Sequence, residues 1–138
     1  MLKDINWIAV IVAVVLLEVL GFLWYGVVFE ARWLAALGHT PDMSNANTMM
    51  ALGAVNQAIA VIGLAWLIRR LGADSVAAAV KVALAAWLFF NFTTMAIEYL
   101  YEGHTAELLA MNMAFQLIAY VLAAVVLALL KPKAVAAA

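Results

Sequence analysis

The sequence contains no cysteine among its 138 residues. This absence excludes a disulfide framework, a thiol nucleophile and a thiolate metal site. Charged residues are also scarce, at 11% of the chain, whereas soluble domains usually contain about 25%. The formal net charge is −1, so the chain lacks the basic footprint that nucleic-acid binding requires. We therefore expect no nucleic-acid partner.

Apolar residues, in contrast, make up 70% of the chain, well above the usual share of about 45–50%. A small domain in water leaves a large fraction of its surface exposed and could not bury so many apolar side chains. Lipid is therefore the expected solvent. Lipid permits only helices and closed barrels, and the apolar runs are too long for strands and show no alternation. The composition predicts an all-α integral membrane protein.

Four apolar runs are long enough to cross about 30 Å of hydrocarbon as helices. They cover approximately 5–29, 48–70, 76–101 and 106–130. The first run is too long for a signal-peptide core and lacks a clear cleavage site, so we interpret it as a retained helix. The short link after the second run predicts an antiparallel hairpin with the third. The whole chain, 1–138, is expected to form one bundle of four transmembrane helices.

The only long connector follows the first run. Its first part, 30–38, has the pattern of a short amphipathic helix that lies in the membrane interface and ends at Gly38. Four spans place both termini and the second connector on one side. That side collects six basic residues, Lys3, Arg69, Arg70, Lys81, Lys131 and Lys133, and the other side has only Arg32. By the positive-inside rule, both termini are expected in the cytoplasm.

Polar and small residues share one stripe of each predicted helix, because residues three or four positions apart lie on one helix face. The stripes comprise Glu18, Gly21 and Tyr25; Gly53, Asn56 or Gln57, Ala60 and Gly63; Trp87, Asn91, Glu98 and Glu102; and Asn112, Gln116, Ala119 and Ala123. Glu18 and Asn91 are expected near the membrane midplane, and the other amides in the outer half. The inner half of each run has almost no polar side chain.

This asymmetry predicts an outward-facing polar cup above an apolar plug. Glu18, Gln57, Asn91, Asn112 and Gln116 would line the cup, with Tyr25 and Trp24 at its mouth. It would hold a small ligand, a lipid headgroup or a partner helix. A more ordinary interpretation makes Glu18 a protonated acid in a structural or oligomer-register role, the amides interhelical hydrogen bonds and the aromatic residues interface anchors.

A transporter or an oligomeric ion or proton channel that uses Glu18 is the alternative function. A pore within one chain is disfavoured because it needs a polar lining along its whole length. An enzyme is also disfavoured, because no nucleophile elbow or Gly-rich phosphate loop occurs, and we assign no catalytic residue. Self-association or an accessory role with another membrane protein is expected, since four short spans bury little protein surface. The sequence does not indicate a cofactor.

Acidic residues gather on the predicted outer rim, where Glu98 and Glu102 lie one helical turn apart. Together with His39, His104 and Glu107 they could surround a metal ion. No HExxH-type motif is present, and a solvated acidic rim explains the same residues. We therefore predict no metal site.

Two short patterns occur twice. Gly-His-Thr follows the first span at 38–40 and the third span at 103–105, and Gln57 and Gln116 precede the similar runs AIAVI and LIAYV. Two helical hairpins related by an axis along the membrane normal would produce this repetition. The two matches need different offsets, so chance is an equal alternative.

Several motifs resemble the bacterial membrane-protein family known as domain of unknown function 1761. They are Asn6-Trp7, Gly21-x-x-Trp24-Tyr25, Phe29 and Trp33 ahead of Gly38, the Glu102-Gly103 turn, and Met111-Asn112-Met113-Ala114-Phe115-Gln116. The chain departs from the family at Glu30, where glycine is frequent, and at Gln116, where histidine is frequent. The resemblance implies a compact four-helix protein of the bacterial inner (plasma) membrane. It implies no activity.

Overall fold

The computed structural model describes residues 5–130, and within this range its regular elements are all helices. Four helical stretches are long and apolar enough to cross a membrane: Trp7–Val28, Ala46–Arg70, Val76–Glu102 and Ala106–Leu129. Each lies within two residues of the bounds predicted from the sequence. The prediction of an all-α protein with four membrane-spanning helices is confirmed.

Eight helical segments make up these spans and their connections. They are α1 (Trp7–Leu23), the π-helix η1 (Trp24–Val28), α2 (Glu30–Leu37), α3 (Ala46–Arg70), α4 (Val76–Ala86), the π-helix η2 (Trp87–Phe92), α5 (Thr93–Glu102) and α6 (Ala106–Leu129). Polar side chains begin three of the helices: Asn6, Ser75 and Thr105 each accept hydrogen bonds from backbone N–H groups of the first turn. The short helix predicted after the first span is α2, and it ends at Gly38 as expected.

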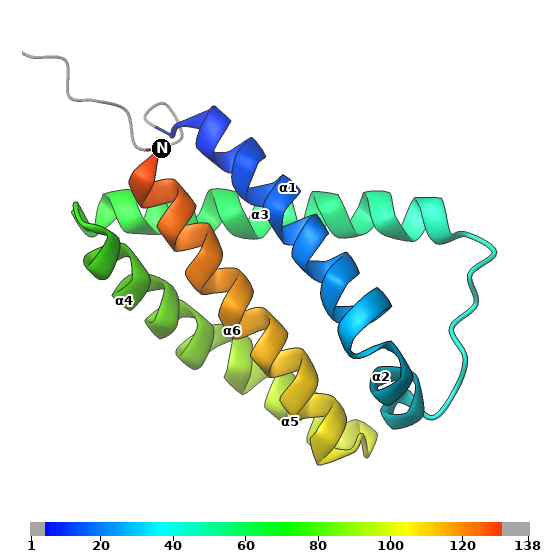
Figure 1. The fold of residues 1–138 in the computed structure, drawn as a ribbon. Coiled ribbons are helices and arrows are strands. Elements are labelled where there is room, and N and C mark those ends of the chain that lie inside the picture. The colour runs from blue at the N-terminus through cyan, green and yellow to red at the C-terminus, as the bar shows by residue number, and fades with distance from the viewer. Residues whose placement is uncertain (1–4, 131–138) are drawn as a thin grey trace, which may run out of the picture.

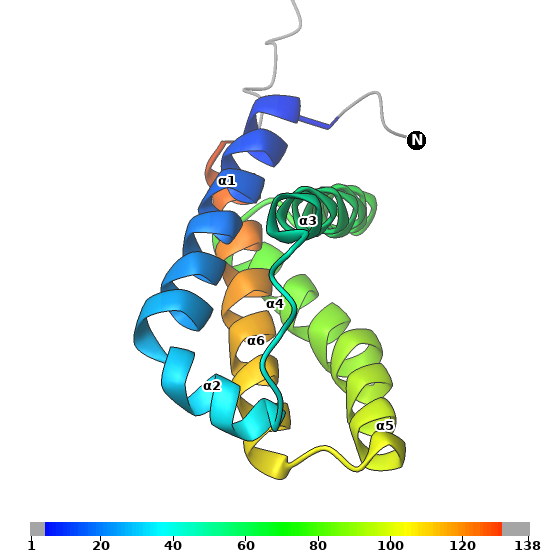
Figure 2. The ribbon, with the colours of Figure 1, turned by 90° about the vertical axis from the view of Figure 1, so that its right-hand side faces the viewer.

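Helix α6 lies between α1 and α4, and the three run side by side (Figure 1). Helix α3 instead runs across them, as two perpendicular views show (Figures 1 and 2). The expected hairpin of α3 and α4 is therefore open, and α4 packs mainly along α6. The reason lies in α3 itself: its buried residues, Val61, Leu64, Ala65 and Ile68, are all in its C-terminal half.

Alanine dominates the contacts between the three aligned helices. The buried alanines are Ala9 and Ala13 on α1, Ala79 and Ala83 on α4, and Ala119, Ala123 and Ala124 on α6. Small residues let helix backbones approach closely, and this packing replaces the hydrophobic driving force that is missing in lipid. The glycines of α3 behave differently from our expectation of close helix contacts: a Cβ added at Gly53 or Gly63 would meet no atom within 4 Å.

Both π-helical segments begin with tryptophan and are braced by the same aromatic contact. The rings of Trp24 and Phe29 have centroids 4.6 Å apart, and those of Trp87 and Phe92 are 5.5 Å apart. Each pair is separated by five positions, the spacing that a π-helix brings onto one face. The Phe29 N–H donates to the Trp24 carbonyl at 2.9 Å, which is the π-type hydrogen bond. Sequence analysis predicted continuous α-helices here and missed both segments.

The order of elements repeats along the chain. A helix, a π-helix, a shorter helix, a Gly-His-Thr turn and a long helix follow one another first as α1 to α3 and again as α4 to α6. The glycine of each turn adopts a left-handed conformation, with φ of 77° at Gly38 and 71° at Gly103. The two halves thus share their order of elements and the conformation of the turn glycine, but the offset between them is not constant: it is 63 residues from Trp24 to Trp87 and 65 from Gly38 to Gly103.

Replacing Gly103 with alanine should lower the free energy of unfolding by about 1 kcal/mol, because alanine is strained at positive φ. Gly53→Ala is the matched control: this glycine lies inside a helix with open space around it, so alanine should be neutral or stabilising. Unfolding by denaturing detergent, followed by circular dichroism, compares the two. Equal destabilisation by both substitutions would contradict the conclusion that the turn requires glycine at position 103.

Candidate functional site

A polar stripe runs along α6 through the interior of the protein. Asn112, Gln116 and Tyr120 are spaced four residues apart and therefore lie on one face of the helix. Each of them faces a polar side chain from a different part of the chain. The stripe thus organises the polar interior into three successive levels.

The first level is a closed hydrogen-bond network. The Tyr25 hydroxyl of η1 donates to Asn112 Oδ1 at 2.9 Å, and Asn112 Nδ2 donates to the Tyr99 hydroxyl of α5. The Tyr25 ring also packs against Phe115, with centroids 5.0 Å apart, and against Trp33 of α2 at 5.3 Å. Because Asn112 uses both ends of its amide, this level joins four elements and leaves little hydrogen-bonding capacity for a ligand.

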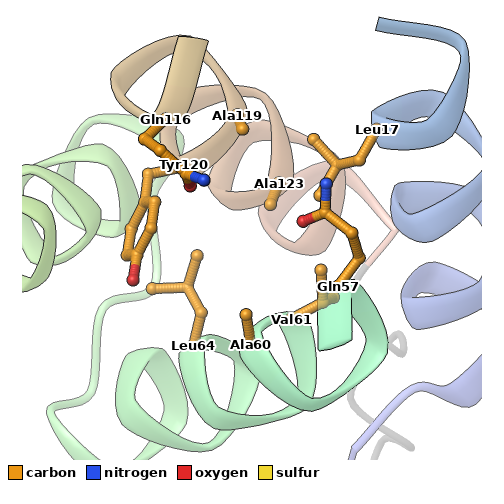
Figure 3. Close-up of a pocket in the computed structure, with 9 residues that line it drawn as sticks. All are labelled: Leu17, Gln57, Ala60, Val61, Leu64, Gln116, Ala119, Tyr120 and Ala123. Carbon is orange, nitrogen blue, oxygen red and sulfur yellow. The ribbon is translucent and has the colours of Figure 1, made fainter. Parts of the chain in front are cut away.

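The second level is a groove between α3 and α6 with about 250 Å³ of empty space, part of which is open to the outside. Its lining comprises Leu17, Gln57, Ala60, Val61, Leu64, Gln116, Ala119, Tyr120 and Ala123 (Figure 3). The amides of Gln57 and Gln116 point into this space from opposite walls. Neither amide has a hydrogen-bond partner within the described residues 5–130. The groove therefore presents two unpaired amides to whatever occupies it.

The depth of these two amides differs from the sequence-based expectation. Gln57 and Gln116 each lie within two residues of the middle of their helices, Ala46–Arg70 and Ala106–Leu129. They were expected in the outer half. Glu18 and Asn91 also lie near the middle of their spans, Trp7–Val28 and Val76–Glu102.

At the third level, the side chain of Asn91 on η2 lies close to the Tyr120 hydroxyl. The Asn91 Oδ1 atom is buried and has no partner among the residues described. The same is true of two indole N–H groups, those of Trp24 and Trp87, which begin the two π-helices. Buried polar atoms without partners concentrate at the π-helices, where the regular backbone pattern is also interrupted.

Glu18 is half-buried on α1, directly after the groove residue Leu17. In the part of the chain that the structure describes, its carboxyl group forms no hydrogen bond or ion pair. A carboxyl group at the centre of a membrane span is costly unless it is protonated, paired or solvated by water. Glu18 therefore stands apart from the other polar residues of the interior.

The outer rim forms two exposed pairs. His104 Nε2 and Glu102 Oε2 are 2.7 Å apart, and Arg32 of α2 donates to Glu107 of α6 at 2.8 Å. Glu98 is exposed. Within residues 5–130, no three His, Asp or Glu side chains are grouped so that they could hold a metal ion.

The six residues predicted to form one cup thus occupy different environments. Tyr25 and Asn112 form a hydrogen bond, Gln57 and Gln116 share the groove, Asn91 lies near Tyr120, and Glu18 has no partner in the described range. Sequence reasoning missed two members of the polar interior: Tyr99, which it counted among the interface anchors, and Tyr120, to which it assigned no role. The spacing of Tyr120, four residues after Gln116, is the signal that could have identified it.

Replacing Asn112 with leucine should lower the free energy of unfolding by about 1–2 kcal/mol, since it removes two interhelical hydrogen bonds worth roughly 0.6 kcal/mol each and leaves two tyrosine hydroxyls unpaired. Asn56→Leu is the matched control, because this amide is exposed on α3. Detergent unfolding of both variants measures the difference. An Asn112→Leu protein as stable as the control would show that the network does not hold the helices together.

The chain was compared with known families, curated proteins and solved structures. No curated protein and no solved structure matches it. A family described as "Protein of unknown function (DUF1761)" matches residues 8–128. This range includes all but the first residue of the first span and the last residue of the fourth, together with the groove and the polar stripe of α6, and the chain therefore belongs to the DUF1761 family.

Proposed function

We propose that this protein binds a small molecule from the surrounding bilayer in the groove between α3 and α6. The observation that carries the proposal is the pair of unpaired amides, Gln57 and Gln116, which point into one space at mid-span. The role is one of binding rather than catalysis, because the sequence offers no nucleophile next to a base.

The cost of leaving these amides unpaired supports a ligand. Water is scarce in the hydrocarbon region, and a polar group without a partner there costs roughly 1–3 kcal/mol even on scales that allow partial compensation. A molecule that forms hydrogen bonds with both amides recovers this free energy. The apolar walls, Leu17, Val61 and Leu64, would contact the rest of that molecule.

The distribution of charge supports an inner-membrane location with both termini in the cytoplasm. The start of α1 and the end of α6 lie at the same end of the molecule, where Asn6 donates a hydrogen bond to the Leu130 carbonyl. The link from α3 to α4, near Arg69 and Arg70, belongs to the same end. Three other basic residues that entered the prediction, Lys3, Lys131 and Lys133, lie outside the described residues.

We also propose that the chain associates with itself through the N-terminal half of α3. This half extends beyond the three aligned helices and exposes Ala51 and Val55, which lie four residues apart on one face of α3 (Figure 1). Small residues on the surface of a membrane helix let the backbone of a second copy approach closely. An accessory role with a different membrane protein is the alternative that measurement of subunit number would reveal.

Replacing both Gln57 and Gln116 with leucine should abolish retention of the ligand without destabilising the protein. Leucine removes the hydrogen bonds to the ligand and also the unpaired polar groups, so the unfolding midpoint should stay equal or rise. Native mass spectrometry of protein extracted gently from its own membrane reports the retained molecule and the subunit number together. Asn56→Leu, one residue before Gln57 and outside the groove, should retain the ligand. Retention by the double variant would refute the proposed site.

Transport is the second candidate function, and the unpaired Glu18 carboxyl group at mid-span favours it. Intramembrane acids commonly serve as proton or ion sites. If Glu18 has this role, purified protein in liposomes should produce a proton flux that falls at least about tenfold in Glu18→Gln, which keeps the shape and removes the titration. A flux equal in both proteins, or equal to that of empty liposomes, would exclude a role of Glu18 in transport.

A further inference from the structure

The two walls of the groove use the same positions along a helix face. Four residues of α3 line it, and each has a counterpart 59 positions later on α6: Gln57 and Gln116, Ala60 and Ala119, Val61 and Tyr120, Leu64 and Ala123. Spacings of three and four residues are those of one helix face. Leu17 is the one lining residue outside this pairing. Two identical amides therefore occupy matching positions on the two walls.

The lining is uncharged. None of the nine residues around the groove is acidic or basic, and the two amides are its most polar groups. An ion at mid-span would need a compensating charge, because its transfer out of water costs far more than that of a neutral polar group. Amides supply hydrogen bonds but no net charge. The groove is therefore suited to a neutral group.

The hydrogen-bonding capacity of the two amides further restricts the chemical class of the ligand. Each glutamine offers two N–H donors and one carbonyl acceptor. A hydroxyl group, with one donor and two acceptor lone pairs, can accept from one amide and donate to the other. The enclosed part of the groove has room for only one small group of about this size, and its open side allows the remainder of a longer molecule to lie along the apolar wall.

We infer that Gln57 and Gln116 act together on one group, and that the groove selects a neutral amphiphile through a single hydroxyl held between the two amides. This inference rests on the proposed function and names the ligand class of the same site. It also predicts that the contributions of the two amides to the free energy of ligand binding are coupled rather than independent, since both amides bind the same group.

The test uses three photoreactive probes of equal chain length in liposomes that contain the full-length protein. The probes carry the same diazirine and differ at one end, as a long-chain alcohol, the corresponding carboxylate and the corresponding trimethylammonium. Peptide mass spectrometry measures labelling of α3 and α6. The alcohol should label these helices most strongly, and Gln57→Leu and Gln116→Leu should each reduce labelling about fivefold to tenfold. The double variant should lose little more than either single variant, and Asn56→Leu should be unchanged.

The outcomes separate the inference from the proposed function. Glutamine-dependent labelling that is strongest with a charged probe would overturn the neutral class while leaving a binding site in the groove. Additive losses in the double variant would overturn the shared group. Absence of glutamine-dependent labelling by all three probes would overturn both, and would indicate that only water bridges the amides.

Discussion

The contact of α6 with α1 on one side and α4 on the other is the interaction on which the rest of the structure depends. Eight of the residues on α6 are buried, more than on any other described helix, and the closest contacts use alanine on all three partners. Lipid offers no hydrophobic gain for bringing helices together, so close van der Waals packing must supply the attraction. The alanine-lined face of α6 meets this requirement and fixes the other elements around it.

The same helix determines which polar side chains inside the protein form hydrogen bonds with one another. At the level of Asn112, tyrosine side chains from η1 and α5 approach closely enough to form hydrogen bonds with both the oxygen and the nitrogen of the amide. One turn further, at Gln116, the facing helix is α3, which crosses α6 instead of lying along it. The two amides at this level are separated by the groove and stay unpaired. A difference in helix direction thus distinguishes a structural network from a candidate site.

The two halves of the chain differ in how their last helices pack. The two halves of the chain share their order of elements, their π-helices and their left-handed glycine turns, but their last helices pack differently. Helix α6 lies along α4, whereas the equivalent α3 is held only by its C-terminal half. The connectors contribute to this: 38–45 is longer than the turn before α6 and lets the start of α3 extend away from the bundle.

Composition and hydrophobic runs alone determined the membrane class, the number of spans, their bounds to within two residues, the short α2 helix with its Gly38 end and the positions of Glu18 and Asn91 near the middle of their spans. These features depend on local chemistry, because the length of an apolar run and the conformational preference of glycine are properties of neighbouring residues. Tertiary structure alone decided which polar residues meet. Helix crossing angles and the wider turns of the π-helices depend on contacts between distant segments. These contacts bring Tyr25 to Asn112 and keep Gln57 apart from Gln116. One stripe of similar amides on α6 was therefore divided into a closed network and an open groove by the direction of α3, which no local pattern encodes.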